Sequence, residues 1–270
     1  MEEKEEEETT VAFNFEYSNE DDNNNIATGT REICLSGCGR PSSVCICAHL
    51  PPTPLLTYSR ILILHHPHEL RHKLSTVPLL SKCLLNFQTL IGRRLRLGLS
   101  PLLDSLYHAA ASSHRPHALF LFPGTDSSPS VDLHDWAAAH PVERTHDLVL
   151  IVFDGTWKHA KEMVSASLPF LSKFSIQVSL KYDVGFDGES AFDSDLVLRK
   201  EPFLGCVSTI EAVARALRIL EVDGVEIEEW LLSVLRAVAQ FQACHFKPVK
   251  PRSKLLKKGK QNKKKDSELE

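Results

Sequence analysis

Short apolar runs that alternate with helical segments constrain the fold of this 270-residue chain more than any other feature. The runs Arg60–Leu64, Ala118–Phe122 and Asp147–Phe153 have the length and composition of buried strands, and each is followed by a histidine, a proline or an aspartate. Strands that alternate with helices predict an α/β fold with a mainly parallel sheet. The other expected elements are strands at 174–178 and 196–198 and helices at 76–90, 133–139, 157–165, 208–220 and 226–244.

Polar residues follow the predicted strands at the edge where ligands bind in open α/β sheets. Asp154 comes directly after the most apolar strand, where a partly dry carboxylate can accept a proton or hold an ammonium group. Taken alone, Asp154-Gly155 also fits a plain turn, and Trp157 fits either a core anchor or a ring that stacks on a base. His65 and His66 fit loop or core positions equally well. The polar set comprises His65, His66, Glu69, Pro123, Gly124, Asp154, Gly155, Thr156, Trp157, Arg199 and Lys200.

Four cysteines, Cys34, Cys38, Cys45 and Cys47, lie close together near the start of the chain. Four thiolates in one loop cluster match the tetrahedral coordination of Zn²⁺, and the glycines and proline between them favour the tight turns that such a cluster needs. The alternatives are two disulfides or four unrelated thiols, and an expected reducing compartment disfavours the disulfides. The spacing does not identify the kind of zinc module. The remaining cysteines fall in apolar context and are expected to be core thiols: Cys83, Cys206 and Cys244.

Composition divides the chain into four predicted segments. Residues 1–30 are acidic and polar and are expected to be disordered. Residues 31–55 hold the cysteine module and a proline-rich linker, and residues 56–245 the α/β domain. Residues 246–270 form a basic tail, which can bind nucleic-acid phosphates, serve as a nuclear-import signal or simply be solvated.

The sequence also argues against several classes of protein. No apolar stretch reaches the roughly 18 residues that a membrane span needs. The acidic start has neither the basic and apolar regions of a secretory signal nor the composition of a transit peptide, so we expect a cytoplasmic or nuclear protein. No G-x-G-x-x-G, Walker A or H-E-x-x-H pattern is present, which excludes the dinucleotide, P-loop and zincin classes.

Five blocks of sequence, in order over about residues 34 to 215, together resemble the DTW-domain family of tRNA-uridine aminocarboxypropyltransferases. The most distinctive is Asp154-Gly155-Thr156-Trp157 after a buried strand, which matches the family's D-x-T-W signature. One departure is Ser75, where many members carry Asn before the Thr. The other blocks are the cysteine cluster with Arg40-Pro41, His66-Pro67-His68-Glu69 with Ser75-Thr76, Phe122-Pro123-Gly124, and Leu198–Pro202 with Ser208–Ala212.

The resemblance implies a fold and an activity. The fold is related to the SPOUT methyltransferases, with a C-terminal trefoil knot around S-adenosylmethionine. The activity is transfer of the 3-amino-3-carboxypropyl group of S-adenosylmethionine, not its methyl group, to N3 of a uridine in tRNA, with a D-loop uridine as the family-level expectation. The implied partners are therefore tRNA and S-adenosylmethionine, with no membrane, and the oligomeric state is not indicated.

The resemblance also implies roles for the site residues. Asp154 is the first candidate for general base or for holding the methionine ammonium, and both roles stay open. The zinc is implied to be structural, because four cysteines leave no open coordination position. The implied catalytic residues are Asp154, Thr156 and Trp157; the cofactor-binding residues are Pro123, Gly124, Asp154, Gly155, Ser208 and Thr209; and the substrate-binding residues are His66, Glu69, Thr76, Arg199 and Lys200.

Three other functions compete with this one. A related enzyme that modifies ribosomal RNA shares the D-x-T-W-like core, and the cysteine cluster favours the tRNA branch. An ordinary RNA methyltransferase would attach a much lighter group to the RNA. A catalytically silent, zinc-containing RNA-binding module would bind RNA without affinity for S-adenosylmethionine.

Overall fold

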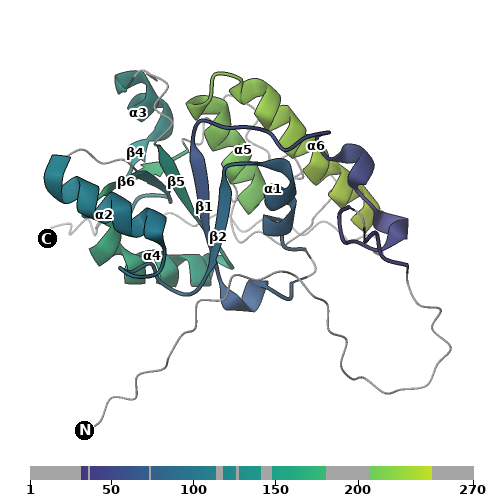
Figure 1. Cartoon of the computed structure of the whole chain (residues 1–270), viewed down its shortest axis with the longest axis horizontal. Helices are drawn as coiled ribbons and strands as arrows, with labels where there is room; N and C mark the ends of the chain where they lie inside the picture. Colours follow the sequence, from purple (N-terminus) through teal and green to yellow (C-terminus); the bar gives the residue numbers. More distant parts are fainter. Residues whose placement is uncertain are drawn as a thin grey trace, which may run out of the picture.

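A six-stranded sheet with helices on both faces organises the chain (Figure 1). This computed structural model describes residues 32–35, 37–72, 74–113, 118–125, 128–140, 148–180 and 207–244. The strands are β1 (Arg60–His65), β2 (Phe87–Ile91), β3 (Ala118–Leu121), β4 (Val131–Asp132), β5 (Val149–Asp154) and β6 (Ser175–Ser179). The α-helices are α1 (Val77–Cys83), α2 (Pro101–Ser113), α3 (Leu133–Ala139), α4 (Trp157–Leu171), α5 (Thr209–Leu220) and α6 (Gly224–Ala243), and the 3₁₀ helices are η1 (Ser42–Val44), η2 (Cys47–His49) and η3 (Pro67–Glu69).

The strand order is β2-β1-β5-β3-β6-β4, and every neighbouring pair is parallel. The predicted α/β class with a parallel sheet is therefore confirmed. All six residues of β5 are buried, as are five of the six residues of β1. Strands buried on both faces read as continuous apolar runs, which is why the sequence pattern identified them.

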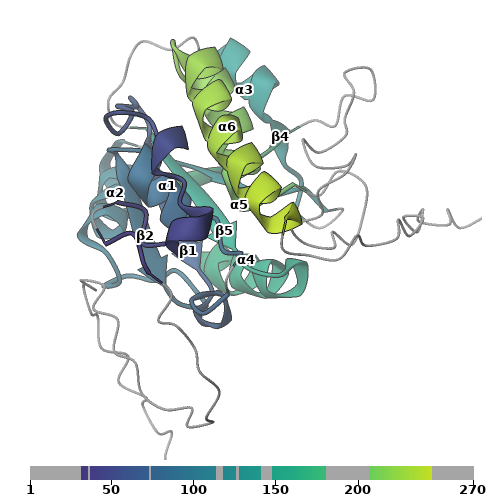
Figure 2. The ribbon, with the colours of Figure 1, turned by 90° about the vertical axis from the view of Figure 1, so that its right-hand side faces the viewer.

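The two faces of the sheet carry separate hydrophobic clusters. Ile61 and Ile63 of β1 pack with residues of α1, α5 and α6, whereas Leu62 and Leu64 pack with residues of α2 and α4. This division follows from the alternation of side chains along a strand. Figures 1 and 2 show α5 and α6 side by side on their face of the sheet, away from α2 and α4.

The helix predicted at 76–90 is wrong in its second half. Helix α1 ends at Cys83, and Phe87–Ile91 forms β2, which pairs with β1 in parallel. The local apolar spacing fits a helix, but pairing with β1 favours the extended chain here. The sequence prediction also missed α2, and it placed the end of α4 six residues early, at 165 instead of Leu171.

Several predictions fall outside the described residues. They concern the strand at 196–198, Arg199, Lys200, Cys206, the acidic start and the basic tail. The expected trefoil knot depends on the path of residues 181–206 and stays an expectation, as do the four segment boundaries. Within the described part of the chain, none of the helices is both long and apolar enough to cross a membrane.

Two of the remaining cysteines differ in their surroundings. Cys83 is fully buried, and burial raises the pKa of its thiol to about 12, as expected of a core thiol. Cys244 is exposed just beyond the end of α6, so the prediction of a core position is wrong for this residue. Helix α6 ends at Ala243, and Cys244 is its C-cap residue.

Candidate active site

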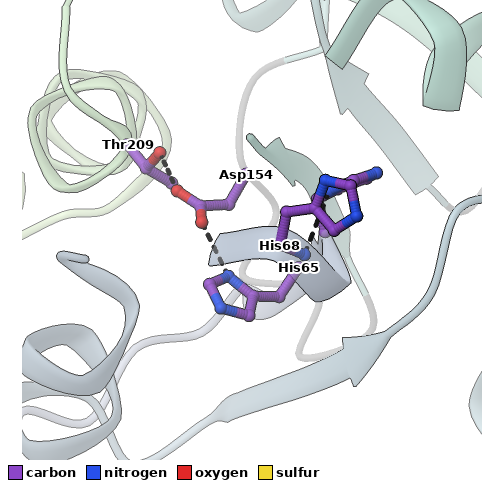
Figure 3. A network of polar contacts seen from close by, with 5 residues as sticks. His65, His68, Asp154 and Thr209 are labelled. Atoms are coloured by element: carbon purple, nitrogen blue, oxygen red, sulfur yellow. Dashed lines mark hydrogen bonds and ion pairs between the residues drawn. The ribbon is translucent and has the colours of Figure 1, made fainter. Parts of the chain in front are cut away.

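The carboxylate of Asp154 lies at the centre of the candidate site, at the last residue of β5. It is buried and pairs in register with His65, the last residue of the neighbouring strand β1. The His65 Nδ1 lies 2.6 Å from Asp154 Oδ2, and the hydroxyl of Thr209 donates to the other oxygen, Oδ1 (Figure 3). Both oxygens of Asp154 therefore have a partner, from two elements that are distant in the sequence.

Helix α5 brings its first residue to this carboxylate. The Ser208 side chain caps the helix and accepts a hydrogen bond from the Glu211 N–H at 3.4 Å, as the sequence predicted. Glu211 is fully buried, and Arg215 donates to its carboxylate at 2.6 Å one turn further on. This cap places Thr209 at the carboxyl edge of the sheet, where the positive end of the helix dipole favours the negative charge of Asp154.

The D-x-T-W segment connects β5 to α4 and is positioned by local contacts. Thr156 is the N-cap of α4, and its hydroxyl accepts a hydrogen bond from the His159 N–H at 3.3 Å. The Trp157 ring stacks on Phe122 at 5.5 Å between ring centroids, so it joins the end of β5 to the end of β3. Thr156 and Trp157 thus have structural partners in addition to their predicted catalytic roles.

The predicted glycines permit close approaches at this edge. A Cβ on Gly124 would lie 2.7 Å from the backbone nitrogen of Ser130, which the backbone could not tolerate without shifting. A Cβ on Gly155 would lie 3.2 Å from the Cβ of His159 and 3.4 Å from that of His66. The side-chain amide of Gln177 in β6 donates to the carbonyls of Phe122 and Pro123, at 3.1 and 3.2 Å.

The predicted substrate-binding residues His66, Glu69 and Thr76 lie in the connection from β1 to α1, and all three are buried. The His66 Nδ1 accepts a hydrogen bond from the backbone of His68 at 3.3 Å. Burial lowers the pKa of the His66 imidazole, and the neighbouring imidazoles and Arg93 lower it further. These residues follow β1 at the same edge of the sheet as Asp154. Of the three, His66 contacts the D-x-T-W segment directly, because its backbone N–H donates to the Asp154 carbonyl at 2.9 Å.

The four cysteines form a cluster that could hold a metal ion, with one sulfur from each within 4.8 Å of the others. The Cys34 and Cys47 sulfurs are 3.5 Å apart, and those of Cys38 and Cys45 are 3.7 Å apart. Zinc–sulfur bonds of about 2.3 Å in a tetrahedron separate the sulfurs by about 3.8 Å, so the donors fit this ion. The four thiols are free, which contradicts the alternative of two disulfides.

The environment of the cysteine cluster lowers the pKa of one thiol, and the cluster packs against the main domain. Burial raises the pKa of Cys38, but hydrogen bonds from the backbone of Ile46 and Arg40 and from the thiols of Cys45 and Cys47 together lower it to about 7, which favours the thiolate that metals bind. Ile46 is fully buried in the hydrophobic cluster that covers one face of the sheet. Lys82 of α1 also donates to the Gly37 carbonyl at 2.8 Å.

Sequence reasoning missed two features of this edge. The sequence indicates His65 only as one of the polar residues after a strand, whereas in the structure its Nδ1 contacts the Asp154 carboxylate. His68 and His159 were not considered as site residues, although both rings contact His66. The sequence shows one apolar run followed by His65-His66 and another followed by Asp154. It does not show that the two strands are neighbours in the sheet.

Comparison with known proteins identifies the family. The model of the DTW domain matches residues 31–243. The chain is 46% identical over 241 residues to tRNA-uridine aminocarboxypropyltransferase A of Arabidopsis thaliana, which covers 86% of this chain and 89% of the relative. It is 33% identical to tRNA-uridine aminocarboxypropyltransferase 2 of Macaca fascicularis, over 83% of this chain and 68% of the relative.

A third relative, tRNA-uridine aminocarboxypropyltransferase 2 of Drosophila melanogaster, is 32% identical over 76% of this chain and 73% of its own length. No solved structure matches the chain. The matched region contains both the cysteine cluster and the complete edge around Asp154. The chain therefore belongs to the DTW domain family.

Proposed function

We propose that this protein transfers the 3-amino-3-carboxypropyl group of S-adenosylmethionine to N3 of a uridine in tRNA. The names of its relatives, which span most of this chain at up to 46% identity, support this reaction. The structural observation that carries the proposal is the buried Asp154 carboxylate, held by His65 and Thr209 at the carboxyl edge of a parallel sheet. This is the edge at which such sheets bind their ligands.

The contacts of Asp154 favour an ammonium-binding role over that of a general base. A carboxylate offers about four lone-pair sites, so Asp154 can accept from His65 and Thr209 and still accept from an ammonium group. Protonation of either oxygen would weaken a hydrogen bond that the fold has already formed. Asp154 is therefore assigned to orient the methionine part of the donor.

His65 is the better candidate for the proton acceptor. An ionised Asp154 can only accept hydrogen bonds, so the hydrogen of the 2.6 Å contact belongs to Nδ1 of His65. The second ring nitrogen, Nε2, then carries a lone pair and can take the proton that leaves uracil N3. Asp154 would stabilise the resulting imidazolium across the same contact.

The donor and the protein divide the remaining chemistry. When bound, S-adenosylmethionine supplies an electrophilic carbon next to a sulfur that leaves as a neutral thioether. The protein has to exclude the methyl group from the nucleophile, which is a matter of orientation. We assign this to the backbone around Pro123, Gly124 and Gly155 and to the N-terminus of α5 at Ser208.

Other parts of the chain are assigned to tRNA and to zinc. Arg199, Lys200 and the basic residues between 247 and 265 are proposed to meet tRNA phosphates, and His66, Glu69 and Thr76 to line the uridine site. The four cysteines are proposed to hold a structural Zn²⁺, with no open position for catalysis. The charge of the tail supports a cytoplasmic or nuclear location.

The test is a reaction of the purified protein with tRNA and S-adenosylmethionine, followed by mass spectrometry of the nucleosides. The expected product is a uridine that carries an aminocarboxypropyl group. Asp154→Asn should reduce its formation by roughly 30- to 5,000-fold, because loss of the carboxylate that pairs with the buried ammonium of the donor costs about 2–5 kcal/mol. Asp223→Asn, a matched change at an exposed residue without a side-chain cap contact, should leave it unchanged.

The outcomes separate the competing functions. A methylated product would establish a methyltransferase, and product on ribosomal RNA but not on tRNA would establish the ribosomal branch. Binding of tRNA without affinity for S-adenosylmethionine, measured by calorimetry, would establish a silent RNA-binding module. Wild-type activity of Asp154→Asn would remove Asp154 from the site.

A further inference from the structure

Three histidine rings cluster beside the candidate active site and have no part in the proposed reaction as a group. His66 and His68 lie in the connection after β1, and His159 lies in the first turn of α4. The His66 and His159 rings are stacked at 3.9 Å between centroids, and the His68 ring meets them edge-on at 4.9 and 5.3 Å. One ring nitrogen from each residue lies within 4.8 Å of the other two.

The backbone of the D-x-T-W segment builds this cluster. Gly155 has no side chain, and the space beside its Cα is closed by the Cβ atoms of His159 and His66. The Thr156 hydroxyl accepts a hydrogen bond from the His159 N–H in the first turn of α4. This contact fixes the backbone position of His159, from which its ring extends. The backbone at Gly155 and Thr156 therefore places the imidazoles of α4 and of the connection after β1 next to each other.

A second observation indicates a missing partner. The Nδ1 atom of His159 is buried and makes no hydrogen bond within the part of the chain that the structure describes. Buried polar atoms are almost always paired with protein, water or an ion. This nitrogen belongs to the ring that stacks on His66, so the unpaired atom is part of one of the three clustered rings.

The donor set selects the class of ligand. Three neutral imidazoles, without thiolate or carboxylate in the set, suit Zn²⁺, Ni²⁺ or Cu²⁺ and not Mg²⁺ or Ca²⁺, which prefer oxygen. Three histidines leave one coordination position for water, in contrast to the closed four-cysteine site. We propose that His66, His68 and His159 form a second metal site, for a divalent transition-metal ion.

Metal binding requires small movements of the rings. Parallel stacked rings direct their lone pairs side by side, so the rings must turn about the Cβ–Cγ bonds until the lone pairs converge at about 2.0–2.1 Å from the ion. If Nε2 of His66 is the ligand, the 3.3 Å contact from the His68 N–H to Nδ1 is given up. His68 is exposed and has room to turn.

The experiment counts metal ions on the untagged, full-length protein. Metal is removed with a chelator, Co²⁺ is titrated in, and bound metal and the visible spectrum are recorded together. The expected result is two ions per chain, one with thiolate-to-cobalt charge transfer from the cysteines and one without it. His159→Gln and His68→Gln should each weaken only the second ion, by more than about 100-fold, since losing even a hydrogen-bond partner behind a ligand costs roughly 10- to 100-fold.

His72→Gln is the matched control, an exposed histidine of the same connection that lies outside the cluster, and it should retain both ions. Circular dichroism shows that each variant is folded. One ion per chain in the wild type would overturn the proposal. A second ion that survives both His68→Gln and His159→Gln would overturn it equally, since that ion would be bound elsewhere.

Discussion

At the scale of single residues, the contacts of Asp154 bear on the two roles that the sequence leaves open for it. The D-x-T-W pattern left Asp154 as either base or ammonium ligand. The structure adds His65 on one carboxylate oxygen and Thr209 on the other, so Asp154 also orients the histidine whose second ring nitrogen we propose as the proton acceptor. The two partners of Asp154 are thus distant in the sequence: His65 lies 89 positions before it and Thr209 lies 55 positions after it.

The substitution His65→Gln separates proton transfer from positioning. The Gln amide can still donate to Asp154 but cannot accept a proton, so we expect kcat to fall on the order of 10²–10⁴-fold. The affinity for S-adenosylmethionine, measured by calorimetry, should change little. His134→Gln, at an exposed position of α3, is the control. A kcat close to that of the wild type would limit His65 to positioning Asp154.

At the scale of elements, α5 connects the two edges of the sheet. Its twelve residues span about 18 Å, close to the roughly 20 Å of the six-residue strands β1 and β5. Thr209 at its start contacts Asp154, and Glu221 directly after its end accepts from the backbone N–H groups of Tyr58 and Ser59 at 2.8 and 2.9 Å. The position of the site therefore depends on both ends of this helix.

Glu221→Gln tests the far attachment of α5. The amide has one oxygen where the carboxylate has two, so one of the two backbone N–H groups loses its acceptor, at a cost of about 1–3 kcal/mol in the free energy of unfolding. Denaturant unfolding measures this change. Glu229→Gln, at an exposed position of α6, should be neutral. Equal stability of the two variants would show that Glu221 does not anchor the helix.

At the scale of the whole molecule, the cysteine module is packed as part of the main domain. Ile46 lies in the same hydrophobic cluster as residues of β1, α5 and α6, and His49 meets Phe241 of α6 edge-on at 6.0 Å between ring centroids. Figure 1 shows the module beside α6. Loss of its metal should therefore disturb the packing on this face of the sheet.

Cys47→Ser tests this connection. We expect one metal ion fewer per chain and a thermal unfolding midpoint lower by about 5 °C or more. Such a shift corresponds to a loss of about 2 kcal/mol in the free energy of unfolding, at roughly 2–4 °C per kcal/mol in a chain of this size. Metal analysis and a calorimetric scan measure the two effects. Cys244→Ser, which changes an exposed thiol outside the cluster, should alter neither. An unchanged midpoint together with the lost metal would mean that the ion does not support the fold.

Local patterns in the sequence were enough for the most apolar elements. Burial on both faces gives the strands β1, β3 and β5 continuous apolar runs, and the cap at Ser208 identifies the start of α5. The helix α3 was predicted from its local sequence as well. The cysteine cluster and the D-x-T-W segment were equally visible, since their residues are close together in the chain. Helix α2 and strand β2 carry weaker patterns and were missed or misassigned.

The sequence by itself thus determined the α/β class, the family and the residue types at the strand ends. Only the tertiary structure decided that β1 lies beside β5 in the register that pairs His65 with Asp154, and that α4 brings His159 onto His66. Strand order and register depend on contacts between segments far apart in the chain, and local periodicity holds no record of them. For the same reason, the strand β2 became apparent only from its parallel pairing with β1.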